Sequence, residues 1–384
     1  MVAMAYGEIK IRNFEKHRDT AKVEDLERKC EVGPRESSFL FTNTMGDPIC
    51  RVRNSPQYKM LVAELENEVV GVIRGSIKIA TVSGPPKDQA KVGYILGLRV
   101  SPLHRRRGIG LSLVRQLEQW FDSNYVEYAY MATEKDNEAS LKLFIGKLGF
   151  IKFRTPMILV NPVRRRSIHI SSRIKITKIK MEQAEHLYRR FMGTAEFFPR
   201  DIDQILKNKL SLGTWVAYPL DESWEHHDCV PTSWAMLSVW NTADVFKLRV
   251  GKPSLSSVLY AKASSLVDRI FPWLRIPVLP DVFNEFGFYF LYGVHGEGPR
   301  SGMLVHSLCQ FVHNLATMCK DCKIIVTEIG PWDALRHHIP HWQSLSCPED
   351  LWCIKSLRSK EEKTLLDWTK RPHPRAIFVD PREV

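Results

Sequence analysis

Hydrophobic residues in the first 160 positions follow two periods, one of two residues and one of three to four. The alternation within residues 59–82 predicts two strands joined by a tight turn near Asn67. Residues 110–124 place their apolar side chains on one side of a predicted helix. Further strands are predicted at 7–14, 91–100, 127–133 and 152–162, with helices at 22–33 and 137–150.

A second unit begins near residue 165. From Arg173 to Lys180, isoleucine mostly alternates with basic residues, which predicts a strand with an apolar inner face and a cationic outer face. The 384 residues are too many for one typical core. We therefore expect two domains, residues 1–165 and 166–384.

The second half repeats features of the first. Thr133-Glu134 and Thr327-Glu328 each end a predicted strand, and about 23 residues upstream of each a glycine-containing loop enters a helix. The two halves also finish alike, with "ILVNP" at 158–162 and "IFVDP" at 377–381. Three matches in the same order predict tandem copies of one mixed α/β domain, the second carrying an insertion.

The composition is typical of a soluble protein. Its excess of basic residues indicates an acidic partner, a nuclear localisation signal or a solvent-exposed basic face. The net charge is +12, and residues 151–190 hold eleven Lys and Arg against two Glu. No stretch approaches the ~20 apolar residues of a membrane span, and no apolar leader opens the sequence. Eight cysteines are too few for a disulfide scaffold, and we expect Cys319 and Cys322 to be free thiols without a metal.

The stretch "LRVSPLHRRRGIG" at 98–110 carries the clearest chemistry. A strand that feeds a glycine turn opening a helix forms an anion site, because the first helical amides lack partners and the helix dipole is positive there. It contains neither GxxxxGK[ST] nor GxGxxG. A phosphate-bearing cofactor, a nucleic acid and a bare basic turn all remain open at this point.

The pattern R-x-x-G-x-G after a strand ending V-x-P resembles the GNAT superfamily of CoA-dependent N-acetyltransferases. "NEASLKLFIGKLGF" at 137–150 is similar to the N-x-x-[AS]…K-x-G-F helix of that superfamily. The resemblance implies tandem GNAT-like domains of α/β (α+β) class, each with a mixed, mostly antiparallel sheet flanked by helices. It also implies that acetyl-CoA is the co-substrate and that no metal is used. The expected cofactor-binding residues are Leu98, Arg99, Val100, Arg105, Arg106, Arg107, Gly108, Ile109, Gly110 and Asn137.

The resemblance extends to one plant family. "LFTNTMGDPICRVRNSP", "EFFPRDID", "NKLSLGTWVA", "EDLWCIK" and "FVDPRE" resemble the HOOKLESS family, from about residue 23 to the end of the chain. This implies an N-acetyltransferase of the nucleus, also of the cytoplasm, acting on a histone or other protein lysine. The family implies control of differential growth, including the apical hook, in response to ethylene, auxin and light.

Catalytic residues are harder to assign. Glu134 is the best general-base candidate, although such a residue is more often a helix cap or a surface carboxylate. Members of the superfamily often use a tyrosine before K-x-G-F as the acid, whereas residues 143–146 here contain no hydroxyl. Strand packing explains the tyrosines at 94, 128 and 130 as well as a proton relay does. We read the histidines at 337, 338 and 341 as surface or packing residues.

The second loop, "GEGPRSG" at 296–302, is less suited to an anion. Pro299 removes one amide donor, and the loop has fewer cations, although His295 and Arg300 remain near it. We therefore expect a degenerate second domain.

Two functions compete. The chain is either an active N-acetyltransferase or a weak or inactive GNAT-like regulatory protein that acts through protein contacts or self-association. Direct nucleic-acid binding is disfavoured, because no recognised module accompanies the basic belt. The expected partners are a protein substrate or a nuclear regulator, with a homo-oligomer also open and no membrane.

Overall fold

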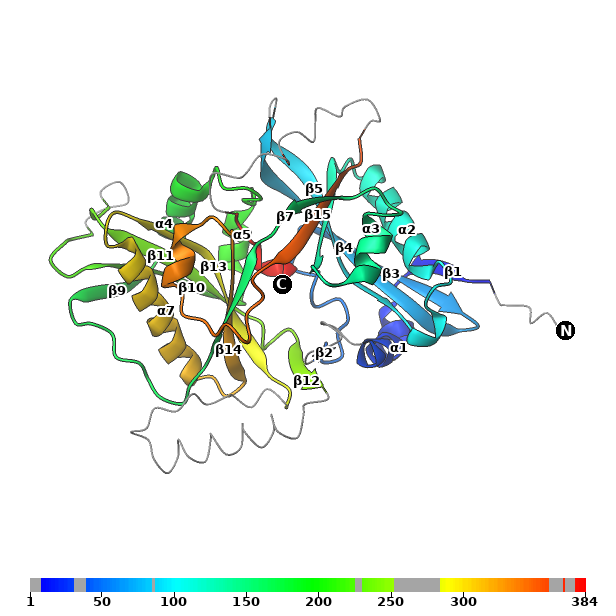
Figure 1. Cartoon of the computed structure of the whole chain (residues 1–384), viewed down its shortest axis with the longest axis horizontal. Helices are drawn as coiled ribbons and strands as arrows, with labels where there is room; N and C mark the ends of the chain where they lie inside the picture. Colours follow the sequence, from blue (N-terminus) through cyan, green and yellow to red (C-terminus); the bar gives the residue numbers. More distant parts are fainter. Residues whose placement is uncertain are drawn as a thin grey trace.

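The computed structural model describes residues 8–30, 39–84, 87–224, 230–251, 284–358, 369 and 377–384. Two large sheets lie side by side, helices cover their outer faces, and the C-terminus lies between them (Figure 1). The α+β class with two mixed sheets, expected from the sequence, is confirmed.

The first sheet has seven strands in the order β1-β3-β4-β5-β6-β15-β7. Only β5 and β6 run parallel, and the other neighbours are antiparallel. Glu66 and Asn67, both with positive φ, form the tight turn predicted between the first long strands. The elements of this half are β1 (Lys10–Asn13), α1 (Lys16–Lys29), β3 (Gln57–Leu65), β4 (Glu68–Gly84), β5 (Lys87–Val100), α2 (Ile109–Ser123), β6 (Tyr128–Glu134), α3 (Glu138–Phe144), β7 (Ile151–Arg154) and β15 (Asp350–Ser356).

The second sheet has six strands in the order β8-β14-β13-β11-β10-β9. Its one parallel pair, β13 with β14, is connected by a helix as β5 and β6 are. The predicted basic strand is β9, at the edge, where Ile174 and Ile176 pack into the core and Lys175 and Lys178 are exposed. Its elements are β8 (Met157–Pro162), β9 (Ile174–Ile179), α4 (Met181–Leu187), α5 (Ile202–Lys207), β10 (Ser211–Pro219), β11 (Trp234–Asn241), β13 (Gly287–Glu297), α7 (Ser301–Thr317) and β14 (Cys322–Ile329).

The repeat predicted from the sequence is present in the topology. The order β3-β4-β5-α2-β6 recurs as β10-β11-β13-α7-β14, and the extra residues of the second copy lie between β11 and β13. Part of that insertion, β12 (Lys247–Gly251), pairs with β2 (Phe39–Asn43) of the first half.

The two halves exchange a strand. β15, from near the end of the chain, lies beside β6 in the first sheet, and β8 lies beside β14 in the second. The third proposed repeat was therefore wrong in structure, because 158–162 is a strand whereas Ile377 makes a single bridge and Pro381 begins a 3₁₀ turn. Both segments end in a proline, which β8 tolerates because it lies at the edge of its sheet, so the proline alone does not decide between a strand and a turn. The domain boundary at 165/166 stays a prediction. The two sheets do not divide there, because β8 precedes it and belongs to the second sheet, while β15 follows it and belongs to the first.

Glycines position α2 on the first sheet. A Cβ on Gly75 would lie 2.8 Å from Leu117, and one on Gly93 would lie 2.8 Å from the Phe121 ring. The helix therefore packs directly on the backbone of β4 and β5, and its N-terminus is fixed at the end of β5.

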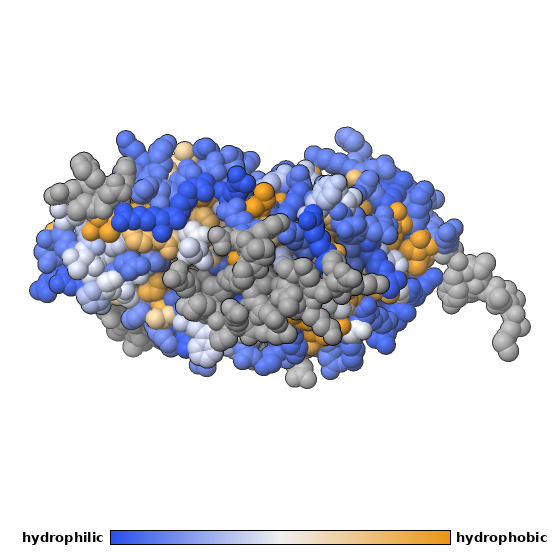
Figure 2. Space-filling model, turned by 90° about the horizontal axis from the view of Figure 1, so that it is seen from above, coloured by the Kyte–Doolittle hydropathy of each residue, from blue (hydrophilic) through white to orange (hydrophobic). Residues whose placement is uncertain are grey.

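The surface is mostly hydrophilic, with isolated apolar side chains, on the face shown in Figure 2. No helix in the described part of the chain is long and apolar enough to cross a membrane.

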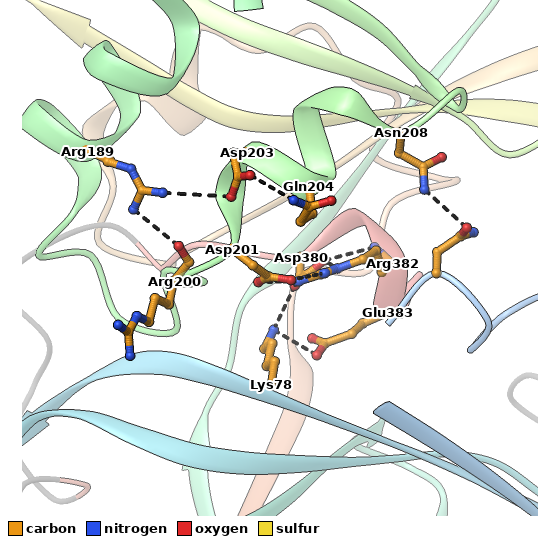
Figure 3. Close-up of polar contacts among 11 residues, drawn as sticks. Lys78, Arg189, Arg200, Asp201, Asp203, Gln204, Asn208, Asp380, Arg382 and Glu383 are labelled. Carbon is orange, nitrogen blue, oxygen red and sulfur yellow. Dashed lines mark hydrogen bonds and ion pairs between the residues drawn. The ribbon is translucent and has the colours of Figure 1, made fainter. Parts of the chain in front are cut away.

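Charged side chains connect the halves inside the molecule (Figure 3). Lys78 of β4 lies 3.2 Å from Asp380 Oδ2 and 2.7 Å from Glu383 Oε1. Arg382 contacts both Asp380, at 2.7 Å, and Asp201 of the second half, at 2.6 Å. Lys78, Asp380, Arg382 and Glu383 are all buried, and the pKa of Asp380 is held low by Arg382 and Lys78 although burial alone would raise it. We call these residues, with Asp201, the ion cluster.

Removing one carboxylate should expose how strongly the ion cluster joins the halves. Asp380→Asn leaves Lys78 and Arg382 short of a buried partner, so we expect it to lower the free energy of unfolding by about 3–5 kcal/mol. Chemical denaturation measures this. Asp25→Asn, which breaks the exposed Asp25–Lys29 pair, is the matched control and should leave stability unchanged. Equal effects of the two substitutions would contradict a joining role.

Candidate active site

The predicted anion loop stands open at the start of α2. Gly108 is the N-cap residue with φ of 83°, and a Cβ added there would meet no atom within 4 Å. Arg105 and Arg106 are exposed beside it, while Arg107 is partly buried. Ile109 anchors the first turn in the core, and the amides at 109 and 110 belong to the first helical turn, which has no intrahelical acceptors. The helix start is therefore open over Gly108, and three arginines precede that glycine in the same loop.

The neighbouring strand has one edge without a strand partner. β5 pairs with β6 only from Val92 to Ile95, yet β5 continues to Val100. The predicted residues Leu98, Arg99 and Val100 lie in this unpaired stretch, which leads directly to the loop. A backbone edge beside an anion loop can hold an extended ligand through main-chain hydrogen bonds.

Asn137 is the N-cap of α3. Its side-chain oxygen accepts a hydrogen bond from the Ser140 amide at 3.2 Å, so Asn137 caps this helix. Leu143 at the other end of α3 lies close to Gly110. The structure thus brings the predicted residues of β5 and of the loop to the start of α2, whereas Asn137 lies at the far end of α3, and the binding role of all of them stays a prediction.

Glu134 does not stand alone. It ends β6 directly opposite Asp350 of β15, and both side chains face the second sheet. Burial, and then the charge of Glu134, raise the pKa of Asp350 to about 7. Burial, and then Asp350, raise the pKa of Glu328 to about 8, and Glu328 accepts a hydrogen bond from Trp352 at 3.0 Å. The pKa of Glu134 is also raised, mainly by burial.

Asp350 was not predicted as a site residue from the sequence, although it lies in "EDLWCIK". Its partner Glu134 is more than two hundred positions away, so only the exchange of β15 brings the pair together. The alignment of Thr133-Glu134 with Thr327-Glu328 was the available signal for Glu328.

The three tyrosines pack as strand residues. The rings of Tyr94 and Tyr130 pack at a tilt of 35° with their centroids 4.8 Å apart, and Tyr130 donates a hydrogen bond to Glu383 at 2.6 Å. Burial raises the pKa of both above the usual range. Tyr128 is buried in the same core. Packing therefore accounts for them.

Known proteins share this sequence and architecture. An acetyltransferase (GNAT) family model matches residues 20–150. "Probable N-acetyltransferase HLS1-like" of Arabidopsis thaliana is 47% identical over 98% of this chain and 99% of its own length. "Probable N-acetyltransferase HLS1" of the same plant is 48% identical over 97% and 99%. The chain belongs to the HLS1 family.

This confirms the HOOKLESS resemblance and the GNAT domain. "Acetyl transferase GW6a" of Oryza sativa subsp. japonica is 37% identical over 98% of this chain and 97% of its own length. Among solved structures, Saccharomyces cerevisiae N-myristoyltransferase with bound myristoyl-CoA covers 94% of this chain and 81% of its own, with a TM-score of 0.57 and 11% identity. A tandem GNAT protein from the clavulanic acid pathway covers 92% and 100%, with a TM-score of 0.52 and 9% identity. These structures share the fold.

The second half of this HLS1-family protein has a different loop. Arg300 is the N-cap of α7 and lies 3.6 Å from Asp221, and a Cβ on Gly302 would lie 2.3 Å from the His338 ring. The 3₁₀ turn Ala334–His338 therefore covers the start of α7, whereas the start of α2 is open. His295 pairs with Glu297 at 3.1 Å.

The remaining sequence features are structural. His338 packs against α7, and His337 and His341 make local contacts with Arg336 and Ile339. Cys319 and Cys322 are free thiols. Within the described ranges, no three His, Cys, Asp or Glu side chains are grouped as a metal site.

The raised pKa of Asp350 predicts a pH-dependent stability. Its folded pKa of about 7 lies above the ordinary carboxyl value, so the folded state binds the proton more tightly and stability falls as pH rises through about 7. One such group contributes up to about 1.4 kcal/mol per pH unit. Calorimetric Tm should therefore fall from pH 5.5 to pH 8, and Asp350→Asn should make the fall shallower.

Glu349→Gln is the matched control for this measurement, because Glu349 is an exposed neighbour paired with Lys135. It should keep the wild-type slope. A slope that is the same in Asp350→Asn and in wild type would remove Asp350 as the titrating group.

Proposed function

We propose that this protein is an acetyl-CoA-dependent N-acetyltransferase whose first half binds the cofactor and whose substrate is a lysine of a nuclear protein. The open loop at the start of α2, next to the unpaired edge of β5, carries the proposal. The empty space over Gly108 fits a phosphate group approaching the backbone, which a side chain at that position would fill.

The predicted residues have separate roles in this site. Arg105, Arg106, Arg107 and the amides of residues 108–110 would hold the pyrophosphate. The backbone of Leu98, Arg99 and Val100 would hold the pantetheine arm and orient the acetyl carbonyl. The thioester supplies the activated acetyl group, and the protein supplies its position.

The carboxylate pair Glu134–Asp350 is the proposed proton acceptor for the attacking amine. Burial and the charge of Glu134 raise the pKa of Asp350 to about 7, so at and above that pH the ionised pair can take one proton from the substrate amine. The last turn of α3 offers no hydroxyl for the leaving thiolate. We therefore assign no side chain as the acid.

The nuclear site of action and the growth role rest on family membership. Relatives in two plants carry N-acetyltransferase or acetyl transferase in their names, and the chain is strongly basic. We propose residence in the nucleus, also in the cytoplasm, and a role in hook growth under ethylene, auxin and light. The covered start of α7 supports a second half that binds no CoA.

A regulatory function without turnover is the second candidate. The absence of a hydroxyl in residues 143–146 favours it. Such a protein would bind a partner or a second copy of itself through the same surfaces.

Blocking the loop should abolish cofactor binding. Trp at position 108 would occupy the space over the loop and strain a backbone with φ of 83°. We expect calorimetry with acetyl-CoA to show binding to wild type and at least about hundredfold weaker binding to Gly108→Trp. Gly149→Trp is the control, because Gly149 also has positive φ and open space. Equal affinities in wild type and Gly108→Trp would refute the loop assignment.

The carboxylate pair should act as one unit in turnover. Glu134→Gln and Asp350→Asn should each lower kcat/KM by about 10²–10⁴, and the double variant should be no slower than the slower single variant. In wild type, kcat/KM should rise with pH through about 7, because only the ionised pair accepts a proton. Mass spectrometry of acetylated peptides measures both.

Glu349→Gln is the control for these rates and should remain near wild type, because Glu349 is an exposed acid next to Asp350 and pairs with Lys135. Unchanged rates in both single variants would exclude the pair from the chemistry while leaving cofactor binding intact.

A further inference from the structure

Three arginines surround one carboxylate beside the unpaired stretch of β5. Arg74 Nη1 lies 2.8 Å from Glu27 Oε1, and Arg99 Nε lies 3.4 Å from Glu27 Oε2. Arg51, from the segment after β2, interacts electrostatically with the same three residues. We call Arg51, Arg74, Arg99 and Glu27 the arginine cluster. It holds three positive charges and one negative.

The cluster has donors to spare. Arg51 Nε, Arg74 Nη2 and Arg99 Nε are buried and have no hydrogen-bond partner, the contact of Arg99 with Glu27 lacking hydrogen-bond geometry. Arg74 is only 1% exposed. A buried guanidinium normally uses its donors, because an unpaired buried charge is strongly unfavourable. Three buried guanidinium groups with unused donors at one place can therefore bind an anion.

The charges of the cluster point to the same conclusion. Burial, then Arg74 and Arg99, lower the pKa of Arg51. The arginines hold the pKa of Glu27 below its usual range although its burial works in the opposite direction. Glu27 is thus fully ionised and still leaves an excess of two positive charges.

The position of the cluster fits an acceptor substrate. Ile73 and Gly75 face α2, so Arg74 between them faces the opposite side of the sheet, the side of Glu134. Arg74 donates to Gly97 O at 3.4 Å, just beyond the last paired residue of β5. The guanidinium of Arg51 lies 5.4 Å from the ring of Phe246, which belongs to the second half. The arginine cluster therefore lies where the two halves meet. It is next to the unpaired stretch of β5, on the face of the first sheet that also carries Glu134.

We propose that the arginine cluster binds a side-chain carboxylate of the acceptor, so that the acetylated lysine lies within an acidic peptide segment. This rests on the proposed acetyltransferase function and narrows its substrate. Glu27 shows that these guanidinium groups accept a carboxylate, and the planar fork of arginine matches that group. The net charge of +12 attracts an acidic segment and repels a basic one.

Two labelled peptides that differ only at the lysine neighbours test the proposal. One carries Glu on both sides of the lysine and the other carries Gln. With the full chain, kcat/KM and the affinity measured by fluorescence anisotropy without acetyl-CoA should both favour the Glu peptide by about tenfold or more. Arg51→Gln, which leaves the Arg74–Glu27 pair in place, should reduce the preference for the Glu peptide over the Gln peptide about tenfold.

Arg53→Gln is the matched control, because Arg53 is exposed on the same segment and pairs with Asp47. It should keep the preference for the Glu peptide. Equal acetylation and equal affinity of the two peptides in wild type would overturn the inference while leaving the acetyltransferase function standing. A preference in anisotropy that depends on Arg51, without any acetylation, would keep the inference and reject the proposed function.

Discussion

The buried contact between Lys78 and the C-terminal turn is the constraint on which the arrangement of the halves depends. Lys78 belongs to the first sheet, and its partners Asp380 and Glu383 are tied through Arg382 to Asp201 of the second half. Charges this deep are tolerated only when every partner is in place. The relative orientation of the sheets, and with it the positions of the carboxylate pair and the arginine cluster, therefore depends on how this turn fits.

The two copies of the fold have diverged around the same structural position. In each copy two parallel strands separate where a helix begins, but only the first helix start is open. In the second copy His338 covers the helix start, and a small cavity near Glu328 is lined by Ile377 and Val379 of the C-terminal segment. The first copy thus provides an open anion loop. At the same position the second copy instead has a carboxylate, Glu328, beside a cavity lined mostly by apolar residues.

Local features of the fold were readable from the sequence, and long-range ones were not. The turn at Asn67, the helix over the glycines and the loop at Gly108 follow from residue periods and backbone chemistry within a few positions. Asp350 and Arg51 gain their meaning from partners on distant segments, which no local period encodes. The predicted repeat of "ILVNP" in "IFVDP" was wrong because an apolar run before a proline is compatible with either a strand or a buried extended segment.

The exchange of β8 and β15 also governs how the protein is made. While a ribosome synthesises the chain, the edge of β6 stays unpaired until residue 356 has emerged, because its neighbour β15 is among the last segments made. An open sheet edge is a site of mispairing and aggregation. The nascent first half therefore cannot complete its sheet ahead of the second, and a prematurely ended chain would leave that edge uncovered.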